Sequence, residues 1–185
     1  MRFGLTLMLV VGILTATTAL EAQSYRDELP FGEHDLINKA LSATEEGNFG
    51  KVKKIVDLLN PLIKGLERRY SVGIYEEINI GIAQENSDKL SRGFYRLAYH
   101  DVIDLLSSAQ DARANSENLA QTWLRKAYLS YGLLSPQVQK ISIATDGNIR
   151  NLFAKAQVAS PSPGAFGDTV VRIKTELEKI SKEFT

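Results

Sequence analysis

Hydrophobic residues recur every three to four positions through most of this chain, which is the period of an amphipathic helix. The clearest stripe begins at Val52 and keeps its phase as far as Tyr70, with mainly lysine, arginine and asparagine on the opposite side. Pro61 lies inside this stripe. Because the phase is unchanged beyond the proline, the pattern predicts one kinked helix rather than two separate ones.

Other segments have the same period and carry capping signals at their ends. They are a first helix from Leu36 to Thr44 ended by Gly47-Asn48, a long helix from Asn86-Ser87-Asp88 to about Ala112, a helix capped by Asn115-Ser116 with a bend at Ser135-Pro136, a shorter helix starting at Thr145 or Asp146, and a last helix capped by Asp168. The fold class predicted is all-α, an antiparallel bundle of six or seven helices.

Residues 72–83 fit two structures. The period of a strand is seen at Ile78, Ile80 and Ile82, which alternate with small or polar residues. The period of a helix is seen at Ile74, Ile78 and Ile82, which are four residues apart. Helices are predicted on both sides, and no partner strand is evident. The neighbouring pattern therefore favours a helix.

The first twenty or so residues have a different pattern. A positive start at Arg2 is followed by an apolar run and then by small residues, which is typical of a secretory signal peptide. Residues 1–19 form this leader if cleavage follows Ala19; cleavage after Ala22 is the alternative, and an uncleaved membrane anchor is a further one. The mature protein is expected to be periplasmic or secreted, with no transmembrane segment.

After the leader we expect a polar lead over residues 20–32 and a single domain over 33–185, with a linker at 159–167 that is rich in proline, glycine and serine. The chain has no cysteine, which excludes thiol catalysis, disulfides and cysteine-ligated metals. Cutting after Ala19 removes one charge, Arg2, from 22 basic and 22 acidic residues. This balance argues against a nucleic-acid surface.

The chain has only two histidines, His34 and His100. His34 lies between two acidic residues at the predicted start of the first helix, where a solvated cap region accounts for it. No zinc-protease, phosphate-loop, dinucleotide or calcium-loop motif is present. We therefore expect a protein that is not an enzyme, with no catalytic residues assigned.

His100 and Asp104 are four residues apart on the long helix and so share one of its faces. With Glu76 or Glu77 from a neighbouring helix they could hold a divalent or ferric metal ion. A helical wheel, however, places both residues with Arg96 and Asp111 on the side away from the apolar positions. A solvated face with local ion pairs is the interpretation that the wheel favours.

Asp101, by contrast, falls among the apolar positions of the same helix. A buried carboxylate needs a partner, and tyrosine hydroxyls or an arginine could provide one. A structural hydrogen bond and contact with a ligand are both open. Nearby tyrosines fit either a core or the lining of a pocket for a small ligand; they are Tyr95, Tyr99, Tyr128 and Tyr131.

Residues 123–157 begin with an Ala-Tyr-x-x-Tyr helix and continue with a shorter helix that ends near a phenylalanine. The positions concerned are Ala127, Tyr128, Tyr131, Ile149 and Phe153. This run resembles the helical extracytoplasmic segment found beside bacterial high-affinity iron permeases, although the permease's own Arg-Glu-x-x-Glu iron motif is absent. The resemblance implies an accessory role in iron handling.

Together these observations predict an exported helical binding or accessory protein. Its ligand could be a metal ion or a small molecule, and its partner an unknown protein, but no nucleic acid is expected. One alternative is a structural or protein–protein interaction module without a small ligand. A hydrolase-type enzyme is the other alternative, with the least support from the residues.

Overall fold

The computed structural model describes residues 26, 29, 32–158 and 163–184, and within them the fold is all-α, as predicted. The predicted leader and most of the polar lead lie outside the described residues. The helices are α2 (Glu33–Glu45), α3 (Phe49–Tyr70), α4 (Ile74–Ala83), α5 (Ser87–Ala112), α6 (Glu117–Ile141), α7 (Ile143–Val158) and α8 (Pro163–Glu178), followed by a short 3-10 turn, η1 (Ser181–Glu183).

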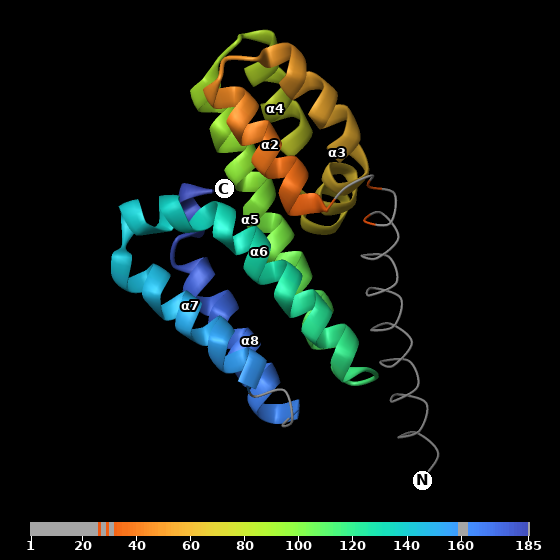
Figure 1. Cartoon of the computed structure of the whole chain (residues 1–185), viewed down its shortest axis with the longest axis vertical. Helices are drawn as coiled ribbons and strands as arrows, with labels where there is room; N and C mark the ends of the chain where they lie inside the picture. The colour runs from red at the N-terminus through yellow and green to blue at the C-terminus, as the bar shows by residue number, and fades with distance from the viewer. Residues whose placement is uncertain (1–25, 27–28, 30–31, 159–162, 185) are drawn as a thin grey trace.

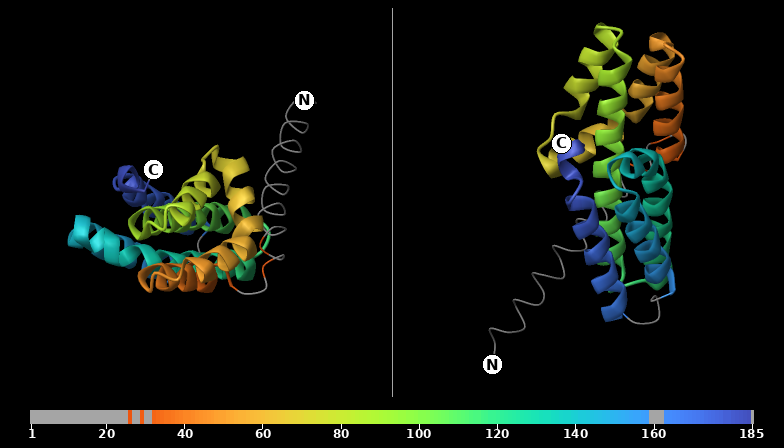
Figure 2. Two further views of the ribbon diagram at one scale, coloured as in Figure 1. Left: turned by 90° about the horizontal axis from the view of Figure 1, so that it is seen from above. Right: turned by 90° about the vertical axis from the view of Figure 1, so that its left-hand side faces the viewer.

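The two longest contacting helices, α5 and α6, form the centre of the molecule and pack against each other more extensively than any other pair. Helices α2, α3 and α4 surround the first half of α5, while α7 and α8 pack together against α6 and the second half of α5 (Figures 1 and 2). Every helix therefore touches the central pair directly or through one neighbour.

Helix ends follow the capping signals of the sequence. The Asn48 side chain accepts from the backbone N–H of Lys51 at the start of α3, and Asn86 does the same for Lys89 at the start of α5. Gly47, with φ of 67°, makes the left-handed turn between α2 and α3. At the start of α6 the Ser116 hydroxyl accepts from the backbone N–H of Leu119. The signals at Asn86 and Ser116 are thus confirmed as caps.

The segment that fitted either helix or strand is helix α4. Its Ile74 and Ile78 are fully buried, so the helical spacing of the isoleucines decides the structure. Close packing follows: a Cβ added at Gly93 of α5 would lie 2.8 Å from Cγ1 of Ile78, and one at Gly81 of α4 would lie 2.9 Å from Cγ of Leu90. The two glycines allow α4 and α5 to approach each other.

The start of the last helix was predicted wrongly. We expected Asp168 to cap it and residues 159–167 to be a linker, but α8 begins at Pro163. Proline is favoured at the first helical position, and Phe166 is fully buried, so its packing holds the first turn. Residues 159–162 of the predicted linker lie outside the described residues.

Prolines inside helices do not end them. Pro61 lies within α3, as expected, and Pro136 lies within α6. The stripe that predicted α3 is buried from Val52 to Leu66. None of the helices in the described part of the chain is both long enough and apolar enough to cross a membrane.

Candidate functional site

Two carboxylates of α5, Asp101 and Asp104, lie completely buried at the centre of the protein. Arg26 reaches both of them: its Nη1 lies 2.5 Å from Oδ1 of Asp101 and its Nη2 lies 2.9 Å from Oδ2 of Asp104. The hydroxyl of Ser130, on α6, donates to the second oxygen of Asp101 at 2.6 Å. The buried position of Asp101 and its arginine partner are therefore confirmed.

The solvated face predicted for His100 and Asp104 is wrong, because the C-terminal end of α3 covers it. From that end Nη1 of Arg69 lies 2.8 Å from Oδ1 of Asp104, and the hydroxyl of Tyr70 donates to the same oxygen at 3.3 Å. A helical wheel treats each helix alone and cannot include a neighbour that arrives from 30 residues earlier. His100 is only 6% exposed for the same reason.

Glu33 completes this buried charge network. Its Oε1 lies 3.4 Å from Nη1 of Arg26 and 3.5 Å from Nζ of Lys126. Burial raises the pKa of Asp101, and the guanidinium of Arg26 opposes that rise. Each carboxylate of the network faces at least one cation, as buried charges require. Both oxygens of Asp101 are engaged by protein donors, which favours its structural interpretation over contact with a ligand.

The four residues suggested as metal ligands are not gathered into one site. Asp104 binds two arginines, Glu77 lies 3.1 Å from Nη1 of Arg96, and Glu76 is exposed. Within the described ranges, no three histidine, cysteine, aspartate or glutamate side chains are grouped so that they could hold a metal ion.

A pocket of about 340 Å³ lies beside the charge network, between the end of α3, the middle of α5, and α8. We call it the His100 pocket; its lining residues are Tyr70, Tyr99, His100, Ile103, Lys174 and Glu178. Its volume falls at the lower end of the range of small-molecule sites. It therefore has room for a molecule built around a single ring.

Three rings form the wall of this pocket. The centroid of the His100 ring lies 5.4 Å from that of Tyr70 and 5.3 Å from that of Tyr99, which meets it edge-on at 84°. On its other side Tyr99 stacks on Phe184, just before the C-terminus, at 5.7 Å. Helices α3 and α5 and the C-terminal turn thus combine to fix an aromatic surface.

His100 is the unusual group in this wall. Its Nε2 is buried and has no hydrogen-bond partner among the described residues. Burial, helped by the charge of Arg96, lowers the pKa of His100 to about 4. The imidazole is therefore neutral at pH 7, with a polar nitrogen left unpaired inside the protein.

Lys174 provides the charge of the pocket. Its Nζ donates to two neutral acceptors, Oγ of Ser107 at 3.0 Å and Oε1 of Gln110 at 3.3 Å. Burial lowers the pKa of Lys174; the negative charge of Asp111 opposes this shift, and the positive charge of Arg69 adds to it. Glu178, one turn further along α8, is exposed, and together with burial it raises the pKa of Tyr99.

The four tyrosines proposed as one cluster lie in three places. Tyr99 is in the His100 pocket. Tyr128 and Tyr131 both pack against Phe153 of α7, with ring centroids 5.3 and 5.7 Å away. Tyr131 is fully buried, and its hydroxyl donates to Oδ1 of Asp146 at 2.7 Å, so it belongs to the core of the α6–α7 contact.

Asp146 is the centre of this second buried polar cluster. Ser135 donates to its Oδ1 at 2.6 Å, while Gln139 and Arg150 donate to its Oδ2 at 2.9 and 3.0 Å. Burial alone would raise the pKa of Asp146, but these bonds and that from Tyr131 lower it below its ordinary value. The cluster holds α7 against α6.

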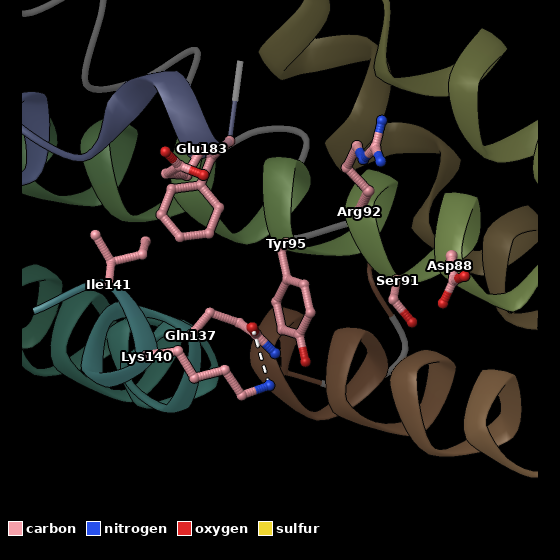
Figure 3. Close-up of a pocket in the computed structure, with 9 residues that line it drawn as sticks. Asp88, Ser91, Arg92, Tyr95, Gln137, Lys140, Ile141 and Glu183 are labelled. Atoms are coloured by element: carbon pink, nitrogen blue, oxygen red, sulfur yellow. Dashed lines mark hydrogen bonds between the residues drawn. The ribbon is translucent and has the colours of Figure 1, made fainter.

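Tyr95 lines a different and more polar pocket of about 340 Å³, between α5, the end of α6 and the C-terminal turn. Figure 3 shows Tyr95 extending from α5 toward Gln137 and Lys140, which are hydrogen-bonded to each other at 3.2 Å. Asp88, Arg92 and Glu183 give its walls charges of both signs. Because its walls carry charges of both signs, this pocket favours no class of ligand as clearly as the His100 pocket does.

Sequence reasoning did not single out three residues of these sites. Arg26 is a lone arginine in a polar segment, 75 positions from Asp101, and nothing in its surroundings marks it. Tyr70 appeared only as the end of the α3 stripe. Lys174 follows the buried Ile173 at the edge of the apolar face of α8, and this position at a helix edge was the one available signal.

No protein-family model matches this chain, and no curated protein or solved structure shows significant similarity to it. The similarity of residues 123–157 to the permease-associated segment therefore stays a prediction. What the fold and the site define is an all-α protein with a ring-lined pocket next to a buried charge network.

Proposed function

We propose that this protein is exported, folds as an antiparallel helical bundle, and binds a small organic molecule in the His100 pocket without converting it chemically. The single observation on which this depends is the buried, unpartnered Nε2 of a histidine that lines a pocket of about 340 Å³. An unpaired buried polar group costs a folded protein about 1–3 kcal/mol. Rotation of the His100 ring toward the pocket would let a ligand hydrogen-bond this nitrogen and recover that energy on binding.

An organic ligand fits these walls better than a metal ion. The residues that line the pocket offer rings, aliphatic groups, the ammonium of Lys174 and the exposed carboxylate of Glu178, which together suit a small organic molecule. Asp104, whose spacing from His100 suggested a metal site, is bonded to two arginines instead. The role in iron handling implied by the resemblance would need another part of the chain.

Native mass spectrometry of protein purified from its own compartment tests binding. We expect the wild type to retain a small molecule, and His100→Phe, which fills the space with a ring that cannot hydrogen-bond, to lose it. His34→Gln changes the other histidine, which lies at the start of α2, and should retain the molecule. Far-UV circular dichroism checks that each variant is folded. Equal retention by His100→Phe would refute the proposal.

The same sample tests export. Cleavage after Ala19 leaves Leu20 as the first residue, and cleavage after Ala22 leaves Gln23. Peptide mapping of the N-terminus should find one of these two ends. A chain that keeps Met1 and sediments with membranes would show that the apolar segment is an anchor.

A further inference from the structure

We infer that the ligand of the His100 pocket is a small aromatic acid whose carboxylate binds Nζ of Lys174 while its ring packs against Tyr70, Tyr99 and His100. This inference rests on the proposed function and adds the chemical class of the ligand.

Lys174 is a half-buried cation whose two hydrogen-bond acceptors are both neutral. Its ammonium group has three hydrogens, and the acceptors at hydrogen-bond distance are the Ser107 hydroxyl and the Gln110 amide oxygen. A buried ammonium is most stable beside an anion. Among the described residues no carboxylate forms an ion pair with it, so an incoming carboxylate would meet a cation that still lacks a direct counter-charge.

The surrounding charges act on Lys174 in both directions, and the largest of these effects is that of the negative Asp111. Arg69, at the end of α3, acts on Lys174 as a further positive charge. The acidic groups near the pocket differ in availability: Asp104 is occupied by Arg26 and Arg69, and Glu178 is exposed to solvent. Solvent and salt screen an exposed charge much more than a half-buried one. The field inside the pocket is therefore that of Lys174 more than that of Glu178.

The apolar wall selects the other half of the ligand. Tyr70, Tyr99 and His100 present ring surfaces, and Ile103 adds an aliphatic one. Aromatic rings pair favourably in offset or edge-to-face arrangements beyond the area that they bury. A planar ring with one carboxylate matches all of these groups.

Three probes of the same size and different charge test the inference: benzoate, benzamide and benzylamine, titrated calorimetrically into the mature protein at pH 7. We expect benzoate to bind at least tenfold more tightly than benzamide, and benzylamine to bind most weakly. Lys174→Met keeps the apolar stem and removes the charge, so it should abolish the preference for benzoate over benzamide. Lys179→Met, at an exposed lysine on the turn after α8, is the matched control and should leave the preference intact.

The outcomes separate this inference from the function on which it rests. Equal binding of the three probes, tighter binding of benzylamine, or an unchanged preference in Lys174→Met would overturn the aromatic-acid assignment and leave the pocket as a binding site. If no probe binds, the assignment also fails. The native mass spectrum, which does not depend on the probes, then decides whether the pocket binds any ligand.

Discussion

Buried carboxylates in this protein are each bonded to donors from other parts of the chain. Asp101 and Asp104 share Arg26, and Asp146 receives bonds from α6 and α7. Removing one member of a buried ion pair costs more than the pair contributes, since the remaining charge stays in a medium that cannot solvate it. Single substitutions at these residues should therefore have large effects.

Arg26→Met tests the larger network. Methionine keeps much of the apolar side chain but removes the positive charge that Asp101 and Asp104 share. We expect the free energy of unfolding to fall by about 3–5 kcal/mol, measured by urea titration. Arg172→Met, at an exposed arginine of α8, should change it by no more than about 0.5 kcal/mol. A loss at Arg26 as small as that at Arg172 would mean that the network contributes little.

The neutral state of His100 makes the stability of the fold depend on pH. In the unfolded chain His100 takes up a proton near its ordinary pKa of 6.5, whereas in the folded protein its pKa is lowered to about 4. As the pH falls through this window the unfolded state binds more protons, so the folded state loses stability.

Comparing His100→Gln with the wild type isolates this effect, because glutamine does not titrate. We expect the free energy of unfolding of the wild type to fall relative to that of His100→Gln as the pH falls from about 6.5 to about 4. At higher pH the difference between the two free energies should be constant. Urea unfolding across this range measures it. His34→Gln, which alters a partly exposed histidine, serves as the control. A constant difference at every pH would show that His100 is not buried as a neutral group.

The positions of most helices in this protein could be predicted from residues close together in the sequence. The contacts between helices could not. The spacing of isoleucines placed α4, and Asn86 and Ser116 placed two helix starts, because a helical face and a cap depend on residues three or four positions apart. The start of α8 was missed by about two turns because the burial of Phe166, a tertiary contact, outweighs a composition typical of loops.

The site was predictable only in part, for the same physical reason. Asp101 among apolar residues signals a buried charge from one helix alone, and that prediction was correct. The covering of Asp104 and His100 depends on where α3 ends in space, and the pairing of Asp101 with Arg26 spans 75 positions. No periodicity within α5 contains that information. Long-range partners therefore had to come from the structure.

The close approach of α4 to α5 gives a prediction for this pair of helices. Gly81→Ala places a Cβ 2.9 Å from Cγ of Leu90 and 3.2 Å from its backbone nitrogen, so the helices must separate. We expect a loss of about 1–3 kcal/mol, typical of overpacking. At Gly132 of α6 an added Cβ meets nothing within 4 Å, and Gly132→Ala should instead stabilise the protein by about 0.4–1 kcal/mol.

Thermal and urea unfolding of both variants would check this prediction. The packing requires that Gly81→Ala lower the free energy of unfolding and that Gly132→Ala raise it. If Gly81→Ala were as stabilising as Gly132→Ala, the α4–α5 contact would be looser than the distances indicate.

The whole molecule is organised around α5. Fifteen of its 26 residues are buried, and it contacts α2, α3, α4, α6 and α8. The helices on either side of the central pair therefore share one core instead of forming two. A chain of this size with one continuous core is expected to unfold in a single cooperative transition.

Leu62→Ala tests that cooperativity, because Leu62 is fully buried in α3 and the only tryptophan, Trp123, lies on α6. Losing a buried leucine side chain costs about 2–5 kcal/mol. If α5 couples the two sides, the substitution must lower the unfolding midpoint seen by Trp123 fluorescence as much as the midpoint seen by far-UV circular dichroism. Two separate transitions, with the fluorescence midpoint unchanged, would mean that α2–α4 unfold independently of α6–α8. The His100 pocket draws its walls from α3, α5 and α8, so ligand binding would then be lost at the first of the two transitions.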